Sequence, residues 1–494
     1  MELINKKTIN EKRYSLVNVP LLIDKVYVLF FLLIVVIYSV NLFYNLGQSI
    51  NDFDEGRHGV SAYEMVKSGN YIVNTYDYKT DYWNLKPPLS FWSIAIGYKL
   101  LGFTPLGLRI GSAIFALITI IIIGLYIRYK YDSLSSIITM MVLSTSIQYL
   151  LIHGARTGDA DSLFIMFFTI AIISMLLSNI SLMWLYLTGL SFSFAFLAKS
   201  WHAGCIPIIL LVYLVITGKL TKLKLKNWFL LFIAALVPIL IWGFIRFQYD
   251  RWTFFQKMIT YDLLKRGSSA IEGHKEGKLF YLECLLRPEY RYWLGFLLLL
   301  LTFSIKNQIK NLLSERRNSL FGISLWIVIP ILLFSSASTK LDWYILPIFP
   351  ALSILIGILG GQIIKNFSLI YKLIIIATTL LCFSYYELAI IKSISIPTQD
   401  NVQSTLHFLG KDKVKSNSKI IYSFPEWTQD NTLAAKLYGN LHPLSGGIQA
   451  FIKNENSLLL IPENKLDNIP QQIGYKVIKN YKNIAIIEHK ESVF

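Results

Sequence analysis

Charged residues are scarce in this chain. Only 16% of its 494 residues are Asp, Glu, Lys or Arg, against about 25% in ordinary soluble proteins. Hydrophobic residues make up 54%, and they gather in blocks long enough to cross a bilayer, which takes roughly 20 residues each. The composition excludes an ordinary soluble globular protein and predicts a polytopic membrane protein.

Cysteine is also rare. The three cysteines, Cys205, Cys284 and Cys382, are far apart, which excludes a disulfide framework and a cysteine metal cluster. The first apolar block lacks a small-residue cleavage site, so we expect a retained span rather than a cleaved signal peptide. No glycine-rich nucleotide fingerprint stands between a strand and a helix, which argues against a nucleotide-bound substrate.

The net charge of +17 would suggest nucleic acid in a soluble protein. Here no basic stripe with interleaved aromatic residues marks a soluble module, so nucleic acid is not expected as a partner. The excess of Lys and Arg instead indicates positive-inside orientation and contact with anionic membrane lipids.

Hydropathy predicts about eleven membrane-spanning helices, with thirteen as the upper bound. The short apolar stretch 89–101 follows Pro87 and Pro88 and is expected to lie at the membrane interface. The expected spans are 26–45, 106–127, 134–152, 162–178, 182–198, 203–217, 228–247, 291–305, 319–337, 343–364 and 369–391.

The distribution of Lys and Arg among the connections predicts the orientation. With the N-terminus in the cytoplasm, every second connection is basic or short and neutral, and counting 89–101 as a span would place the basic ones outside. The basic segments are Lys6 to Lys25, Arg128/Lys130, Lys219 to Lys226, Lys306 to Arg317 and Lys365/Lys372. We therefore expect a multi-pass protein of the bacterial inner membrane, with the first periplasmic loop at 46–105.

The chain divides into a membrane domain at 1–392 and a C-terminal domain at 393–494. The tail carries strand-like runs at 419–424, 457–461 and 483–488, a helix-like stretch at 430–438, and turn signals between them. We expect a small α/β domain on the periplasmic side.

The first outer loop carries the strongest chemical signal. Asp54, Glu55, Arg57 and His58 follow directly after the first span, and carboxylates at a membrane boundary serve as general bases or metal ligands. Lys86 precedes two prolines, which fix the backbone where the next helix starts. A solvated helix cap and a snorkelling lysine are the alternative interpretations.

Other outer connections are also charged. The run HGARTGDADSLF places His153, Arg156, Asp159 and Asp161 between two spans, where charges are costly and often functional; an internal ion pair would explain them as well. Two further turns pair a lysine with aromatics, and a long fourth loop at 248–290 contains Asp262 and Arg266. These turns are Lys199-Ser200-Trp201-His202 and Thr339-Lys340-Leu341-Asp342-Trp343-Tyr344.

Carboxylates and cations from separate loops thus share one face of the membrane. Cations suit the phosphate of a polyprenyl-phosphate sugar, and a carboxylate suits deprotonation of an acceptor hydroxyl. The contributing cations are Arg57, Lys86, Arg156, Lys199, Arg266 and Lys340. The pattern predicts a glycosyltransferase with a lipid-linked donor and a lipid, glycan or protein acceptor.

The first-loop motif resembles glycosyltransferase family 39, which includes bacterial lipid A aminoarabinose transferases and protein O-mannosyltransferases. Later segments resemble the family in the same order, and the likeness covers roughly 26–365. The matching residues are Asp54-Glu55-Gly56-Arg57, Glu64-Met65, Ser68 to Tyr71, Lys86 to Leu89, Phe91-Trp92, Gly102, Leu108-Arg109, Arg156 to Asp161, Leu197 to Lys199, Pro207, Ser338 to Lys340 and Tyr344 to Pro347.

The resemblance implies the GT-C fold and an inverting transfer. Asp54 would be the catalytic base with Glu55 as its partner. By the resemblance, the donor phosphate would be held by Lys86, Lys199, Arg266 and Tyr344. From the charge pattern we expect Arg57 and Lys340 to bind the phosphate as well, and His58, Arg156, Asp159 and Asp161 to support the site.

Three positions depart from the family pattern. Leu85 stands where the aminoarabinose enzymes carry an acidic residue, and His58 stands where tyrosine is usual. The glycine expected after Lys199 is Ser200, with Gly204 further on. These departures put an aminoarabinose substrate in question and leave a bound divalent metal open; no other cofactor is expected.

Three other kinds of membrane protein share part of this pattern. A transporter or flippase of lipid-linked or anionic substrates predicts charges at mid-membrane and inverted repeats with broken helices, whereas here the charges avoid the centres of the spans. An oligosaccharide polymerase or ligase would depend on arginines in large outer loops. A non-catalytic scaffold would need no convergence of carboxylates and cations.

Overall fold

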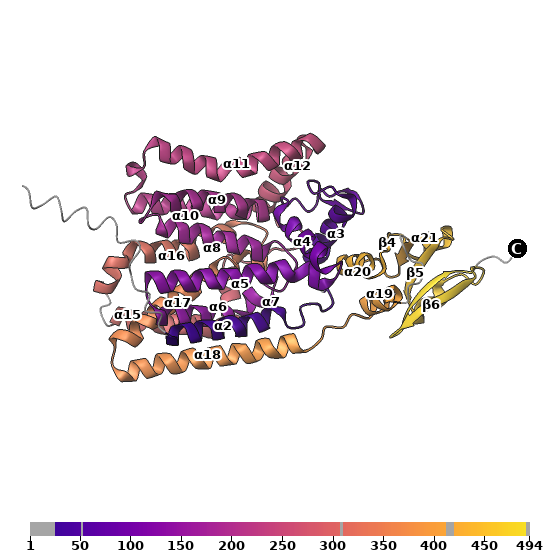
Figure 1. The fold of residues 1–494 in the computed structure, drawn as a ribbon. Coiled ribbons are helices and arrows are strands. Elements are labelled where there is room, and N and C mark those ends of the chain that lie inside the picture. The colour runs from indigo at the N-terminus through magenta and orange to yellow at the C-terminus, as the bar shows by residue number, and fades with distance from the viewer. Residues whose placement is uncertain (1–24, 51–52, 307–309, 412–418, 491–494) are drawn as a thin grey trace, which may run out of the picture.

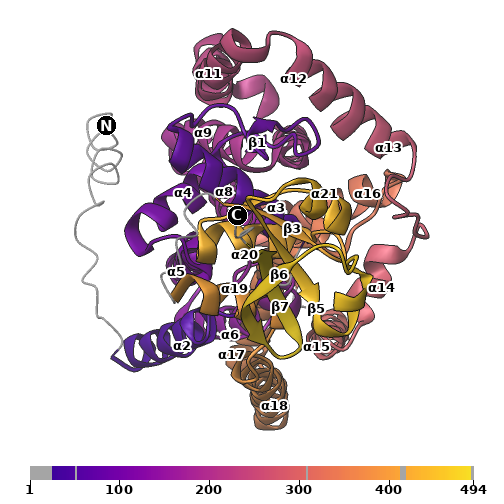
Figure 2. The ribbon, with the colours of Figure 1, turned by 90° about the vertical axis from the view of Figure 1, so that its right-hand side faces the viewer.

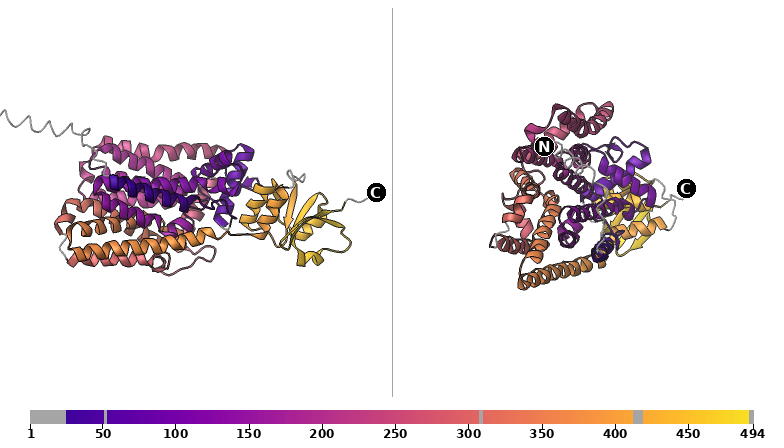
Figure 3. Two further views of the ribbon diagram at one scale, coloured as in Figure 1. Left: turned by 60° about the horizontal axis from the view of Figure 1, so that its bottom comes forward. Right: turned by 60° about the vertical axis from the view of Figure 1, so that its left-hand side comes forward.

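A bundle of long helices carries a smaller α/β domain at one end (Figures 1 and 3). The computed structural model describes residues 25–50, 53–306, 310–411 and 419–490. The basic N-terminal segment used for orientation, apart from Lys25, lies outside the described residues.

All eleven expected spans coincide with helical segments. The third span is broken into two helices, and α9 and α10 are joined by the short 3₁₀ helix η2 (Ser200–Gly204). The corresponding helices are α2 (Lys25–Phe43), α5 (Pro105–Lys130), α6 (Ser133–Ser144) with α7 (Ile147–Leu151), α8 (Asp161–Leu177), α9 (Leu182–Lys199), α10 (Cys205–Ile216), α11 (Leu225–Asp250), α15 (Arg291–Lys306), α16 (Lys310–Ser336), α17 (Ile348–Asn366) and α18 (Leu369–Ser395). Within the described residues, seven helical stretches are long and apolar enough to cross a membrane, with α9 and α10 counted together, and α6, α8 and α15 are shorter apolar helices. The mainly helical membrane fold is confirmed.

Burial separates central helices from lipid-facing ones. Helix α17 is 83% buried over its most apolar window, whereas α11 is 11% buried and α18 is 22% buried; the last two form opposite edges of the bundle (Figure 1). On α17, a Cβ at Gly357 would lie 1.9 Å from Thr139 Oγ1, and one at Gly361 would lie 2.2 Å from Ser135 Oγ. Small residues four positions apart therefore let α6 and α17 pack closely, as is common in membrane bundles.

The first outer loop contains more regular secondary structure than the sequence predicted. It contains the helix α3 (Phe53–Ser68) and a small hairpin of β1 (Thr75–Tyr76) and β2 (Lys79–Thr80), followed by α4 (Leu89–Leu101). The sequence assigned this segment to a loop, and the structure corrects that assignment. Asp54 and Glu55 lie in the first turn of a helix, where carboxylates are stabilised by the helix dipole.

The fourth outer loop is largely helical as well. Helix α12 (Thr253–Lys257), the π-helix η4 (Met258–Lys265) and α13 (Arg266–Ser268) follow one another, and α14 (Phe280–Leu286) precedes the next span. The short 3₁₀ helices η3 (Leu220–Lys222) and η5 (Asp342–Ile345) lie in other connections.

The C-terminal domain is α/β, as expected. Its sheet has the strand order β4-β3-β5-β7-β6, with β3 parallel to β4 and β5, and with β7 antiparallel to β5 and β6. Two of its strands, β4 and β6, had no clear sequence signal. The elements are α19 (Asn401–Lys411), β3 (Ile420–Ser423), α20 (Gln429–Gly439), β4 (His442–Pro443), α21 (Gly447–Lys453), β5 (Ser457–Pro462), η6 (Glu463–Asn468), β6 (Tyr475–Tyr481) and β7 (Ile484–His489).

Helix α20 joins this domain to the membrane bundle. Viewed from the domain end, α20 lies directly over α3 (Figure 2). Leu433 and Leu437 of α20 share an apolar cluster with Val60 and Tyr63 of α3 and Leu108 of α5. The domain is therefore packed onto the segment that carries the sequence-predicted carboxylates.

Candidate active site

A cavity of about 580 Å³ opens at the end of the bundle nearest α3. Its wall combines the start of α3, the segment 83–86, the turn after α9, the helical segment around Asp262 and Arg266, and the residues of η5. The cavity thus gathers segments from every charged outer connection that the sequence singled out.

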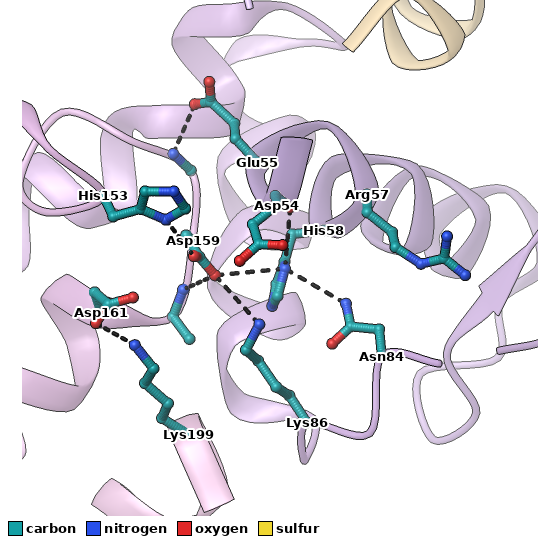
Figure 4. A network of polar contacts seen from close by, with 12 residues as sticks. Asp54, Glu55, Arg57, His58, Asn84, Lys86, His153, Asp159, Asp161 and Lys199 are labelled. Carbon is teal, nitrogen blue, oxygen red and sulfur yellow. Dashed lines mark hydrogen bonds and ion pairs between the residues drawn. The ribbon is translucent and has the colours of Figure 1, made fainter. Parts of the chain in front are cut away.

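Asp54 and Glu55 are adjacent in sequence but have different surroundings, because neighbouring helical side chains point in different directions. Asp54 lines the cavity. Glu55 is buried, and its carboxylate accepts hydrogen bonds at 2.7 Å from Arg109 Nε, Arg109 Nη2 and Gly158 N. Figure 4 shows the two carboxylates directed apart. Glu55 therefore anchors α3 to α5 and to the second outer loop.

Each cation that lines the cavity has an acidic partner. Arg57 binds Asp81 through two hydrogen bonds of 2.8 and 2.9 Å, Lys86 Nζ lies 3.8 Å from Asp159 Oδ1, and Arg266 Nε lies 3.2 Å from Asp262 Oδ1. Lys199 pairs with Asp161. The side chains of Asp81, Asp159 and Asp161 are at most 2% exposed and do not line the cavity. Each therefore fixes its cation from the buried side.

Asp159 is the centre of a buried network (Figure 4). His58 Nδ1 and His153 Nδ1 lie 3.4 and 3.3 Å from its two carboxylate oxygens. Burial raises the pKa of Asp159, but Lys86 and His58 lower it by more, and the result is well below the ordinary value. Burial lowers the pKa of Lys86, yet the surrounding carboxylates, Asp159 first, bring it above the ordinary value. Lys86 is therefore a permanent cation at the cavity wall.

His58 is a neutral member of this network. Burial, reinforced by the charge of Lys86, lowers its pKa to about 3. Its Nδ1 lies 3.2 Å from the carbonyl oxygen of Asp54 and 3.4 Å from Asn84 Nδ2, and its ring stacks on Phe91. His58 supports the first turn of α3 and does not line the cavity.

The turn after α9 contains a strained residue. Ser200 has φ +48°, a conformation that favours glycine and costs other residues roughly 1–2 kcal/mol. Glycine, which the sequence resemblance led us to expect at this position, would adopt this conformation without that cost. Ser200 Oγ compensates by donating a 3.1 Å hydrogen bond to Asp262 Oδ2, which ties the turn to the π-helix. Such helices often occur at functional sites.

Arg266 and Tyr344 contact each other at the cavity wall. Arg266 Nη1 donates to the Tyr344 hydroxyl at 3.4 Å, and the Tyr344 ring lies 5.8 Å from Lys199 Nζ. Burial lowers the pKa of Arg266, but Tyr344 and Asp262 raise it above its ordinary value. Both residues line the cavity; their role in holding a phosphate stays a prediction.

Two sequence-predicted cations lie outside the cavity lining. Arg156 donates to the carbonyl oxygens of Asn41, Leu42 and Tyr44 at 2.6–2.9 Å and therefore ties the second outer loop to the end of α2. Lys340 donates to the Glu276 carbonyl oxygen at 3.3 Å. Both side chains therefore donate hydrogen bonds to backbone carbonyl groups of nearby segments.

The cavity also includes His153, His202 and Trp343, to which the sequence gave no catalytic or phosphate-binding role. His153 stacks on Trp343 with the ring centroids 3.6 Å apart, and His202 packs edge-on against Tyr344 at 4.5 Å. All four line the cavity. Their positions inside the charged outer turns were a usable signal, because each belongs to a run that the sequence marked as unusual.

One group of side chains has the composition of a divalent-metal site. One potential ligand atom from each of Asp54, His153 and Asp159 lies within 4.8 Å of the others, and oxygen and imidazole ligands suit several divalent ions. The Lys86 ammonium, 3.8 Å from Asp159, already places positive charge beside the same carboxylate. A metal would therefore have to compete with Lys86.

The sequence of this chain is similar to those of several membrane proteins. Residues 85–242 match the family described as dolichyl-phosphate-mannose-protein mannosyltransferase. The undecaprenyl phosphate-alpha-4-amino-4-deoxy-L-arabinose arabinosyl transferase 2 of Proteus mirabilis is 26% identical over 64% of this chain and 56% of that protein. An uncharacterized protein of Aquifex aeolicus is 26% identical over 72% of this chain and 70% of its own length.

The fold comparison agrees. The structure of ArnT from Cupriavidus metallidurans bound to undecaprenyl phosphate superposes with a TM-score of 0.74 at 14% identity, covering 94% of this chain and 98% of that one. The chain therefore has the fold of the ArnT structure, and its sequence is similar to membrane glycosyltransferases that use polyprenyl-phosphate sugars.

A more distant neighbour has the same architecture. The oligosaccharyltransferase AglB from Archaeoglobus fulgidus has a TM-score of 0.54 at 10% identity, covering 92% of this chain and 74% of that one. The chain spans just over half the length of the Proteus mirabilis relative. The comparisons support the enzyme class and the multi-pass membrane fold.

Proposed function

We propose that this glycosyltransferase moves a sugar from a polyprenyl-phosphate donor to a lipid, glycan or protein acceptor at the outer face of the bacterial inner membrane. One observation carries the proposal. The Asp54 carboxylate and the cations Lys86, Lys199 and Arg266 line a single cavity at the end of the membrane bundle.

The transfer would proceed by one displacement. The acceptor oxygen attacks the anomeric carbon on the face opposite the phosphate, and its proton passes to Asp54, which acts as general base. The bond between the anomeric carbon and the phosphate oxygen breaks, and the bonding electrons leave with the phosphate. Lys86, Lys199 and Arg266 stabilise the developing charge. The displacement inverts the anomeric configuration and releases polyprenyl phosphate.

The relatives support a donor of this class. The Proteus mirabilis protein is named for undecaprenyl phosphate, and the Cupriavidus metallidurans structure contains this lipid. The matched family is described by a dolichyl-phosphate sugar. All three names share a polyprenyl phosphate, whereas the sugars and acceptors differ, so the proposal specifies the lipid carrier and leaves the sugar to experiment.

The placement at the outer face rests on the sequence. The charged cavity lies at the end of the bundle that carries the connections expected outside. The strongly basic connections, such as 219–226, are expected on the cytoplasmic side by the positive-inside rule. A lipid-linked donor also fits this face, because it needs no cytoplasmic nucleotide sugar.

A transporter remains the alternative from another class. It would place ionisable residues at mid-membrane near broken helices. Lys199 and Asp161 instead lie at the ends of α9 and α8, beside the extramembrane α3, so the cavity suits chemistry at the membrane surface. The related proteins with established names are transferases.

The decisive experiment compares wild type with Asp54→Asn in detergent against a panel of polyprenyl-phosphate sugars. We expect the wild type to transfer one of them, and the variant to bind the same donor without turnover. Asp467→Asn, on the exposed surface of the C-terminal domain, is the matched control and should retain full activity. Wild-type turnover in Asp54→Asn would refute the assignment of the base, and absence of both donor binding and transfer in wild type would favour the transporter.

A further inference from the structure

The C-terminal domain contacts α3, the helix that carries Asp54. A Cβ on Gly56 would lie 2.6 Å from Asp430 N and 2.6 Å from the carbonyl carbon of Gln429, both at the start of α20. A Cβ on Gly59 would lie 2.3 Å from Leu433 Cδ2. Helix α20 therefore packs against the backbone of α3 one turn from Asp54 (Figure 2), and this distance of approach requires glycine.

A buried ion pair crosses the same interface. Lys436 of α20 is 2% exposed at its side chain, and its Nζ lies 3.0 Å from Oε1 of Glu64, which is fully buried. The ammonium also lies 4.8 Å from the centre of the Tyr78 ring, within range of a cation–π interaction. A lysine of the C-terminal domain thus provides the charge partner of a carboxylate inside the membrane domain.

Glu64 connects this lysine to the hairpin of the first outer loop. Its Oε2 accepts hydrogen bonds from Thr75 Oγ1 at 2.6 Å and from Tyr78 N at 3.0 Å. The first strand and the turn of the hairpin are therefore held against α3 by a carboxylate whose charge Lys436 balances. A buried carboxylate left without such a partner is strongly unfavourable.

The hairpin leads directly to the cavity wall. Immediately after it, Asp81 binds Arg57 and accepts from the backbone N–H groups of Trp83 and Asn84. Lys86 follows two residues later. Asp54 and Lys86, the proposed base and a proposed phosphate ligand, are therefore both carried by the segments that α20 clamps together.

We infer that Lys436 is a positioning residue for the transfer reaction, and that α20 sets the relative placement of Asp54 and Lys86 through its contacts with α3 and Glu64. This inference rests on the function proposed above. It gives the C-terminal domain a part in turnover without any contact with substrate. A displacement of about 1 Å in a reacting group can reduce a rate roughly a hundredfold.

The first test uses the full-length chain with Lys436→Met. We expect kcat to fall about 10–100-fold while donor KM changes less than about twofold, because the phosphate ligands themselves remain. Lys436→Arg, which keeps the charge, should recover most of the activity. Lys453→Met, on an exposed lysine of α21, is the control and should match wild type.

A double variant separates positioning from stability. Lys436→Met leaves Glu64 buried without its partner and lowers thermal stability, whereas Lys436→Met with Glu64→Gln removes both charges and should restore it. We expect kcat to stay low in the double variant. If kcat recovered together with the unfolding temperature, Lys436 would be only a structural residue and the inference would be wrong.

Gly56→Ala tests the backbone contact without altering a charge. The new methyl group meets α20 backbone, so kcat should again fall at least about tenfold. Gly295→Ala, where a Cβ meets nothing within 4 Å, should leave kcat unchanged. Equal activity of Gly56→Ala and Gly295→Ala would overturn a role for this contact.

Hydrogen exchange gives a readout that does not depend on the reaction. In Lys436→Met we expect faster amide exchange in residues 53–68 and 75–86 than in wild type, with no change in α17. Unchanged exchange in both segments would refute the inference even if transfer were confirmed. Faster exchange combined with a wild type that transfers no sugar would refute the proposed function and leave the clamp standing.

Discussion

Asp54 and Glu55 are neighbours in sequence, yet conservative amide substitutions should separate them. Asp54→Asn changes a group that lines the cavity, whereas Glu55→Gln changes the buried partner of Arg109. We expect the first variant to lose turnover with little change in stability. We expect the second to lose stability.

The magnitude for Glu55 follows from its contacts. Its side chain is 2% exposed and that of Arg109 is 9% exposed, and the carboxylate accepts three hydrogen bonds at 2.7 Å. Glutamine keeps one accepting oxygen but directs an NH₂ group at Arg109 or at Gly158 N–H, donor against donor. Breaking a buried ion pair costs about 3–5 kcal/mol.

The assay is thermal unfolding in detergent, followed by tryptophan fluorescence, together with sugar transfer. Glu55→Gln should lower the Tm by about 5 °C or more, and Glu455→Gln, an exposed control on the C-terminal domain, should not. Asp54→Asn should keep its Tm while kcat falls about 10²–10⁴-fold, the usual contribution of a general base. If Glu55→Gln kept its Tm and lost kcat as Asp54→Asn does, Glu55 would take part in the chemistry and the assignment of roles would be wrong.

Three further predictions concern the charges around the cavity. His58 has a pKa of about 3 in the folded protein and about 6.5 in the unfolded chain, so the folded state binds fewer protons between these values; the Tm should fall as the pH drops from 6.5 towards 3, and His58→Gln should flatten this dependence unless the assignment is wrong. Lys86→Met should weaken donor binding about tenfold or more, measured by titration, whereas Lys340→Met, outside the cavity lining, should bind as wild type does; equal losses would contradict the placement. Because Lys86 already provides positive charge beside Asp159, turnover should persist in EDTA, and loss of activity that Mn²⁺ or Mg²⁺ restores would show that a metal replaces Lys86 there.

The sequence predicted the spans because the signal is local. A run of about 20 apolar residues is favoured in a bilayer whatever surrounds it, so every expected span coincided with helical segments. Short apolar runs bounded by turn signals predicted β3, β5 and β7 for the same reason, whereas β6, in which polar residues interrupt the apolar ones, gave no such pattern.

Helix α3 was not predicted, because its own sequence argues against it. Gly56 and Gly59 lower helix propensity by about 1 kcal/mol each, and polar residues interrupt the apolar pattern. Packing on α4 and α20 stabilises the helix, and the glycines that weaken it locally are what allow α20 to approach. Only the folded structure shows both the low helix propensity of this segment and the packing that offsets it.

The sequence by itself determined the class of the protein, the membrane spans, the α/β tail and the set of charged outer segments, since each depends on composition or on a short local pattern. Only the tertiary structure decided which charges share the cavity. In the folded protein Asp54 faces the cavity and Glu55 binds Arg109. Arg156 donates to backbone carbonyl groups, and Lys436 pairs with Glu64. Side-chain direction and long-range pairing arise from packing between segments far apart in the chain, and no local pattern specifies them.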